Sequence, residues 1–339
     1  MIIKIFKVSI LIITLLTSTN LFSKEINIYS HRQPFLIDPF LEIFTKQTGI
    51  KTNVIYSKKG LAQRLQSEGE NSPADVVLTV DIGRLYIYAD LNLLAKVASP
   101  KLIENIPSHM RSPDNSWFAL SKRARVIAVN SDKINEGEIT RLEDLADPKW
   151  VGQICSRPGS HVYNRGIMAS VLAEYGFEKA EQWAKGLVAN FARRPQGNDR
   201  AQIKSIYEGE CNIAIINNYY YGKLKFSEDP EQRKWINKIR LVFPNQDKDD
   251  RGAHVNISGG GVAIHSENKK EAVQLLEFLT SYKAQKLYGK INFEYPINPK
   301  IQPSDELKSW GKFREDQLPI VKIAELSPEA QKIIDRVGW

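Results

Sequence analysis

The sequence predicts an α/β protein of two lobes, each a mostly parallel sheet wrapped by helices, with two crossing strands that join them. Strand-like and helix-like segments alternate from residue 26 to residue 94, which indicates a parallel sheet with helical connections. Val76–Val80 is a nearly continuous apolar run, as expected of a strand buried on both faces. A second alternating set lies between residues 123 and 243, so we expect a second lobe of the same class.

The elements of the first lobe follow from these patterns. Gly49 and Gly69 each follow a helical pattern and indicate where it ends. The expected strands are 26–29, 50–56 and 76–80, and the expected helices are 39–48, 60–68 and 82–94. In the second lobe, the expected strands are 153–156, 212–216 and 240–243, and the expected helices are 165–175, 179–189 and 202–208. From 269–286 onward the chain is predicted to be helical.

Two strand-like segments, 123–129 and the glycine-rich 254–265, are predicted to carry the chain between the lobes. Ser258–Gly261 supplies backbone freedom beside one of them, which suits a hinge. The expected segments are a leader (1–23), the first part of lobe one (24–125), lobe two (126–252), and a return to lobe one with C-terminal helices (253–339). The alternative is two independent domains in tandem, but no Pro/Ser/Gly linker occurs at mid-chain.

The first 23 residues are typical of a secretory signal peptide. Lys4 and Lys7 give a basic start, Val8–Leu16 is largely apolar, and Ser23 is a small residue at the expected cleavage point. A transmembrane anchor is the alternative, but a span needs about 20 apolar residues. We therefore expect export to the periplasm.

Two cysteines, Cys155 and Cys211, are expected to form a disulfide in an exported protein, although two buried free thiols are the alternative. The net charge of +8 comes from interspersed charges, and no nucleic-acid-binding motif is present, so we expect no nucleic-acid partner. The sequence also lacks G-x-S-x-G, Walker and G-x-G-x-x-G motifs and Cys/His zinc patterns. These absences argue against an enzyme.

Tyrosines follow two strands of the predicted second lobe, where helices should begin. Ligands of open α/β sheets bind beyond the carboxyl ends of strands, and Tyr163 and Tyr219–Tyr221 occupy such places. A helix N-terminus favours a phenolate, which is otherwise scarce because the reference pKa of tyrosine is about 10. A trivalent hard cation would complete the deprotonation. Aromatic packing is the alternative for the triplet, and a surface-loop tyrosine is the alternative for Tyr163.

Several long stretches resemble the periplasmic ferric-iron-binding proteins of ABC importers, a family with the type II periplasmic-binding-protein fold. The matching stretches are Asn71–Asp81, Trp117–Val126, Trp183–Leu187, Gln196–Asp199, Pro244–Asp247 and His254–Gly259. The resemblance implies that Tyr163, Tyr219 and Tyr220 bind Fe(III), with Tyr221 as a neighbour. It also implies a monomer that delivers iron to an inner-membrane ABC permease.

The first loop departs from the family, which commonly reads Ser-Arg-His-Tyr there. Here Gln33 and Pro34 take the places of the His and Tyr, so three tyrosines and open positions are expected. An anion such as bicarbonate or citrate, paired with Arg32, is expected to fill those positions. His31 is a further candidate ligand, with an exposed loop histidine as the alternative. Two alternatives stay open at this point: a binding protein for an iron chelate or small organic anion, with Arg32 and Arg123 as clamps, and a sensor protein that uses closure to signal.

Overall fold

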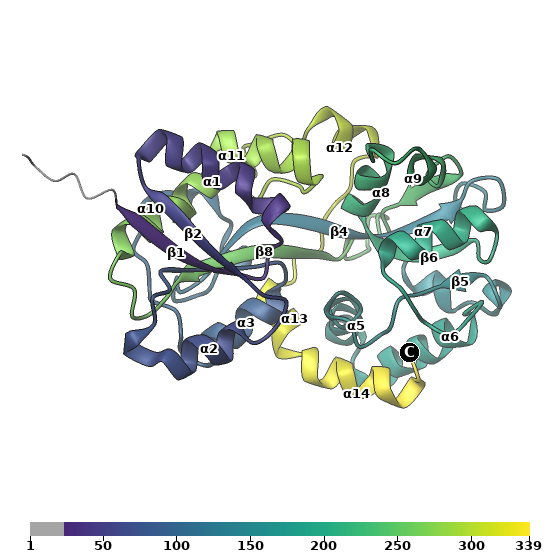
Figure 1. Cartoon of the computed structure of the whole chain (residues 1–339). Coiled ribbons are helices and arrows are strands. Elements are labelled where there is room, and N and C mark those ends of the chain that lie inside the picture. The colour runs from purple at the N-terminus through teal and green to yellow at the C-terminus, as the bar shows by residue number, and fades with distance from the viewer. Residues whose placement is uncertain (1–23) are drawn as a thin grey trace, which may run out of the picture.

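One mixed sheet runs through both lobes. The computed structural model describes residues 24–339, so the predicted signal peptide 1–23 lies outside the described residues. Within them, eight strands form a sheet in the order β2-β1-β3-β8-β4-β6-β5, and β7 pairs with β4. Figure 1 shows the two groups of helices that flank it, with β4 and β8 passing between the lobes.

Lobe one has the predicted alternation of strands and helices. Its elements are β1 (Glu25–Ser30), α1 (Pro34–Thr48), β2 (Lys51–Tyr56), α2 (Leu61–Glu68), β3 (Val76–Thr79), α3 (Ile82–Asp90) and α4 (Pro100–Asn105). β1 pairs in parallel with both β2 and β3, as predicted. α1 begins five residues before the expected start, since proline suits the first turn of a helix. It ends at Gly49, which adopts the left-handed conformation (φ 74°).

The crossing strands are β4 (Phe118–Asn130) and β8 (Val255–Val262), and they make the sheet mixed. They run antiparallel to each other, β8 runs antiparallel to β3, and β4 runs antiparallel to β6 (Ile213–Asn217) and β7 (Ile239–Val242). In lobe two, the parallel pairing that we expected occurs between β5 (Ile154–Cys155) and β6.

The glycines of the second crossing strand serve close packing. Ser258–Gly261 lies inside β8 and is buried between β3 and β4. A Cβ atom at Gly260 would lie 2.5 Å from Val77 O, and one at Gly261 would lie 2.6 Å from Ser116 O. The expectation that these glycines supply hinge freedom is therefore corrected: neighbouring backbones approach too closely for any side chain.

Lobe two places both cysteines beside neighbouring strands. Its helices are α5 (Val162–Tyr175), α6 (Phe177–Ala189), α7 (Asp199–Glu208), α8 (Asn218–Lys225) and α9 (Pro230–Lys234). Cys155 ends β5, Cys211 precedes β6, and the two form the predicted disulfide with a Cα–Cα distance of 5.8 Å. α5 begins three residues before the expected start, so Tyr163 lies in its first turn.

The C-terminal segment crosses from lobe one to lobe two. Its helices are α10 (Lys269–Leu279), α11 (Tyr282–Leu287), α12 (Asp305–Ser309), α13 (Ile320–Glu325) and α14 (Ser327–Val337). The helix expected over 269–286 is two helices, because the Ser281 side chain caps the start of the second one. α13 packs on α3 and α5, and α14 packs on α5 and α6, as Figure 1 shows in yellow.

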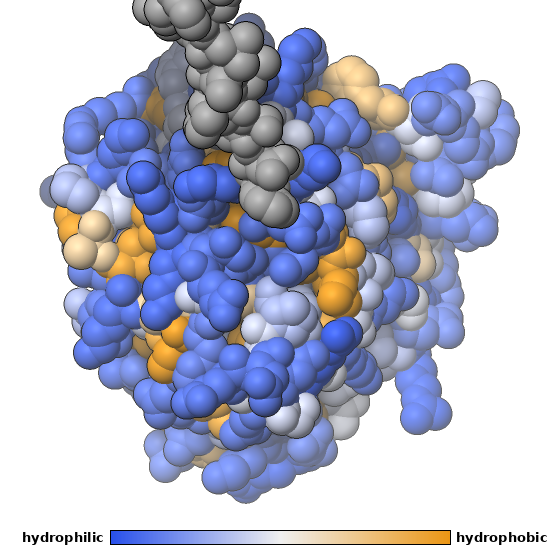
Figure 2. Space-filling view, turned by 60° about the vertical axis from the view of Figure 1, so that its left-hand side comes forward, coloured by the Kyte–Doolittle hydropathy of each residue, from blue (hydrophilic) through white to orange (hydrophobic). Residues whose placement is uncertain are grey.

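On the face shown in Figure 2, hydrophilic residues predominate and hydrophobic ones form small, separate patches. Across residues 24–339, no helix is both long enough and apolar enough to span a bilayer.

Candidate functional site

A cavity of about 460 Å³ lies between the lobes and collects the predicted tyrosines. Tyr163, Tyr219 and Tyr220 line it from lobe two, and His31 and Gln33 line it from lobe one. The tyrosines reach one place because α5 and α8 follow the carboxyl ends of the neighbouring strands β5 and β6.

Tyr219 contacts both of the other assigned tyrosines, whereas Tyr221 packs elsewhere. The hydroxyl of Tyr219 donates a hydrogen bond to the hydroxyl of Tyr163 (3.1 Å), and the rings of Tyr219 and Tyr220 lie 4.5 Å apart between centroids. The ring of Tyr221 instead packs edge-on against Trp310 at 5.5 Å. Tyr221 is not among the residues that line the cavity.

Burial keeps the phenols of Tyr219 and Tyr220 protonated in the metal-free protein. It raises the pKa of Tyr220 to about 12, with a further contribution from Tyr163. Burial and the neighbouring tyrosines raise the pKa of Tyr219 well above its ordinary value. A phenolate therefore forms in this cavity only when a cation arrives to compensate its charge.

Three arginines surround the ring of Tyr163. The guanidinium carbons of Arg123, Arg125 and Arg157 lie 5.4, 5.8 and 5.1 Å from its centroid. Such cations lie within range of the negative face of an aromatic ring. Sequence reasoning missed Arg125 and Arg157, although a charged residue inside a buried strand such as β4 was a usable signal.

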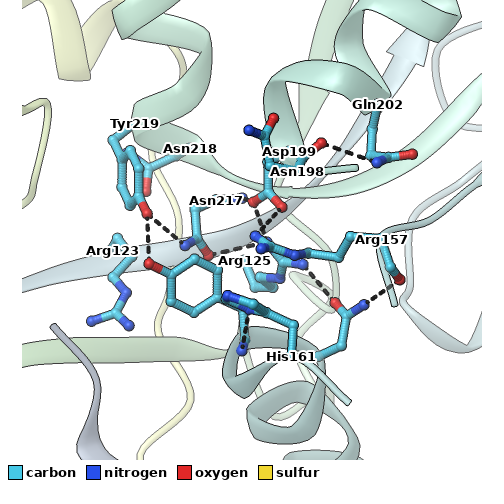
Figure 3. A network of polar contacts seen from close by, with 12 residues as sticks. Arg123, Arg125, Arg157, His161, Asn198, Asp199, Gln202, Asn217, Asn218 and Tyr219 are labelled. Carbon is cyan, nitrogen blue, oxygen red and sulfur yellow. Dashed lines mark hydrogen bonds and ion pairs between the residues drawn. The ribbon is translucent and has the colours of Figure 1, made fainter. Parts of the chain in front are cut away.

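A fully buried carboxylate organises this cluster. Asp199 pairs with Arg125 (2.6 Å) and Arg157 (2.9 Å), as Figure 3 shows. Burial alone would raise the pKa of Asp199, but the two arginines hold it below its ordinary value. Asp199 also accepts a hydrogen bond from the backbone N–H of Asn217 (2.8 Å), whose side chain donates to Tyr219 (3.2 Å). One carboxylate thus links the bases of both tyrosine-bearing helices.

His161 caps the helix that carries Tyr163. Its Nδ1 accepts a hydrogen bond from the backbone N–H of Tyr163 (3.2 Å). Burial, followed by the nearby Arg157, lowers the pKa of His161 to about 3. The side chain is therefore a neutral acceptor at physiological pH. The sequence offered no signal for this role, because the five histidines are scattered without a zinc signature and histidine is an uncommon helix cap.

Arg32 has a different environment from the one we expected. It is buried, its Nη2 pairs with Glu294 (2.8 Å), and its Nη1 donates to Ser258 Oγ (2.6 Å). Its Nε faces Leu36 O at 3.4 Å, and Arg32 is not among the residues that line the cavity. The structure therefore does not place Arg32 as an anion site, because an internal carboxylate already compensates its charge.

The remaining lobe-one candidates are also engaged. The Nδ1 of His31 lies 2.7 Å from Ser57 O, and its Nε2 lies 2.9 Å from the Tyr88 hydroxyl. Pro34 starts α1.

Within residues 24–339, no group of three or more His, Cys, Asp or Glu side chains is arranged to hold a metal. The tyrosines are therefore the candidate metal ligands. The positive charge of the cavity lining comes from basic side chains other than Arg32, which include Lys58, Lys59, Arg84, Arg200 and Lys223.

Comparisons with known proteins identify the family to which the chain belongs. Residues 71–314 match a family described as "Bacterial extracellular solute-binding protein". The chain is 42% identical over 317 residues to "Iron uptake protein A1" of Synechocystis, covering 93% of this chain and 88% of that protein. It is 28% identical over 318 residues to the "Major ferric iron-binding protein" of Neisseria meningitidis, covering 93% of each.

Solved structures of ferric-binding proteins are also similar to this chain. A Trichodesmium protein "in complex with iron and citrate ligands" is 43% identical with a TM-score of 0.88, covering 93% of this chain and 99% of that chain. The ferric iron-binding protein A of Mannheimia haemolytica, in an open conformation, is 43% identical with a TM-score of 0.87, covering 93% and 98%. The chain belongs to the family of bacterial extracellular solute-binding proteins, and its fold is the two-lobed fold of the periplasmic ferric-binding proteins.

Proposed function

We propose that this protein captures ferric iron in the periplasm and delivers it, as a monomer, to an ABC permease of the inner membrane. The observation that carries the proposal is the meeting of Tyr163, Tyr219 and Tyr220 in one cavity, with two of their hydroxyls 3.1 Å apart. The names of the relatives, iron uptake and ferric iron-binding proteins, support it.

The chemistry of the donors favours a hard trivalent cation. Phenolate oxygens are hard ligands, and three of them balance three positive charges. Because burial disfavours an uncompensated phenolate, the site favours cations of high charge over monovalent ones. The protein performs no chemistry on the iron in this account; it holds the ion while the lobes close around it.

An exogenous anion completes the coordination in this proposal. Citrate and bicarbonate are both suited, and a relative from Trichodesmium has been solved with iron and citrate. Arg84 and Arg200 line the cavity, and Arg200 also lies over the Tyr220 ring at 5.5 Å. They are better placed for the anion than Arg32, which would first have to exchange Glu294.

A second candidate is a receptor for an anionic ferric chelate taken up whole. The excess of basic over acidic side chains in the cavity lining favours it, since the lining carboxylate, Glu294, is already paired. The two candidates differ in their requirement for the anion: a whole chelate must bind together with its iron, whereas a completing anion can be exchanged for another.

Iron loading tests the proposal. Protein purified after export should be loaded with Fe(III) in the presence of citrate or bicarbonate, and its iron content and visible spectrum measured. We expect one iron per chain and a red-to-violet charge-transfer band that dithionite bleaches. Loading with either anion supports the completing-anion form, and loading with citrate alone supports the chelate form. A colourless protein without iron under both conditions would overturn the proposal.

A further inference from the structure

The loop that leads to Tyr163 is held from outside the cavity by Trp339. Residues 156–161 connect β5, which is two residues long, to α5. The indole N–H of Trp339 donates a hydrogen bond to Ser156 Oγ (2.8 Å), and the backbone N–H of Gly159 donates to Trp339 O (3.2 Å). A residue far away in sequence thus supports the loop at two points.

The contact is close-packed. Trp339 is buried, and its ring lies edge-on to Trp183 at 6.1 Å. A Cβ atom at Gly159 would lie 2.7 Å from Trp339 Cγ and 2.8 Å from Ile334 Cγ2. The loop backbone therefore rests directly on the end of α14, and no side chain fits between them.

A chain of hydrogen bonds leads from this contact to Asn164, which is adjacent to Tyr163 in the sequence. Asn164, the neighbour of Tyr163, donates to Arg157 O (3.0 Å) and approaches Ser156 Oγ at 3.5 Å. Its Oδ1 accepts a hydrogen bond from Arg125 (2.6 Å). Arg157, which lies in the loop, stacks over the Tyr163 ring. A displacement of the loop at Ser156 would therefore move the groups that surround Tyr163.

We propose that Trp339 is a positioning residue for the tyrosine site. Its indole N–H and ring fix residues 156–161, and through them they fix the place of Tyr163 and Arg157. The inference rests on the proposed function in so far as Tyr163 is a ligand of the metal. Groups that orient a metal ligand without touching the metal typically change affinity by about 10–100-fold.

The test compares two substitutions in one aromatic cluster. Trp339→Phe keeps a ring and removes the N–H that reaches Ser156. Trp183→Phe removes an N–H that donates to Leu142 O (3.3 Å), away from the loop, and is the matched control. We expect Trp339→Phe to lower Fe(III) affinity by about tenfold and to shift the visible band. Trp183→Phe should leave both at the wild-type values.

A second variant keeps the proposal testable if Trp339→Phe fails to fold. Ser156→Ala removes the acceptor and should weaken iron binding at least as much. The double variant should bind no more weakly than Ser156→Ala alone, because both changes act through one hydrogen bond.

A measurement on the metal-free protein separates this inference from the proposed function. Amide hydrogen exchange of residues 156–163 should be faster in Trp339→Phe and unchanged in Trp183→Phe. Unchanged exchange and affinity in Trp339→Phe would overturn the positioning role, as would equal losses in both tryptophan variants. If the wild-type protein binds no iron, the proposed function fails, and the exchange rates still decide the role of Trp339.

Discussion

The hydroxyl of Tyr219 lies 3.1 Å from the hydroxyl of Tyr163, although 56 residues separate them in the sequence. Each tyrosine sits in the first turn of a helix that follows one of two neighbouring strands. In the metal-free protein, the two phenols are joined by this hydrogen bond. A cation that displaces their protons would find both oxygens already close together.

Loss of a single tyrosine oxygen should weaken iron binding strongly. Tyr219→Phe and Tyr220→Phe each keep the ring, so packing should survive while one ligand is lost. Fe(III) affinity, measured by competition with a chelator, should fall by more than about 100-fold, because even outer-shell partners contribute about 10–100-fold. Tyr221→Phe is the control, since that ring faces Trp310, and its affinity should match the wild type. An equal loss in all three variants would contradict the assignment.

Iron affinity should fall as the pH falls. In the metal-free protein the pKa of Tyr220 is about 12 and that of Tyr219 is well above its ordinary value, so both phenols carry protons at neutral pH. Binding as phenolates releases two protons, so affinity should drop by about 100-fold per pH unit from these two residues. Chelator competition between pH 6 and 8 measures the slope. An affinity independent of pH would exclude phenolate ligation.

The disulfide should stabilise lobe two. Cys155 and Cys211 close a loop of 56 residues, which corresponds to about 4 kcal/mol on the chain-entropy model. The double substitution Cys155→Ala/Cys211→Ala should lower the free energy of unfolding in urea by an amount of this order. Thiol titration of the unreduced, unfolded wild-type protein should detect no free thiol, and two titratable thiols would refute the bridge.

The ion pair of Arg32 and Glu294 should prove to be structural. Glu294→Gln leaves the buried Arg32 without its carboxylate, and breaking such a pair typically destabilises a protein by about 3–5 kcal/mol. Thermal or urea unfolding measures this loss. If Arg32 is instead the anion site, Glu294→Gln should keep its stability and bind citrate more tightly, which citrate titration of the iron-loaded protein would detect.

Much of the fold could be predicted from periodicity and from the family resemblance. The alternation of strands and helices in lobe one and the pairing of β5 with β6 follow from local patterns. The mixed sheet could not be predicted from local patterns, because the direction of a strand depends on how the chain returns to the sheet. The close packing at Gly260 and Gly261 could not be predicted either, since it depends on backbones that approach from other strands.

The candidate site, like the fold, could be predicted from the sequence only in part. The tyrosines could be found because they follow strands and match a family motif. The burial of Arg32 beside Glu294 could not, since the two residues are 262 positions apart. Asp199 stood in a matching stretch, but only the fold brings it between Arg125 and Arg157. Trp339 gave no local signal, because its partner Ser156 lies 183 positions away in the sequence.

The position of the metal tests the central claim most directly. Crystals of the iron-loaded protein, measured at the iron absorption edge, give an anomalous difference map that locates iron without reference to any assumed ligand. We predict one peak per chain, in the cavity between the lobes, within bonding distance of the phenolate oxygens of Tyr163, Tyr219 and Tyr220. A peak away from these three oxygens, or no peak in protein loaded with either citrate or bicarbonate, would contradict the account.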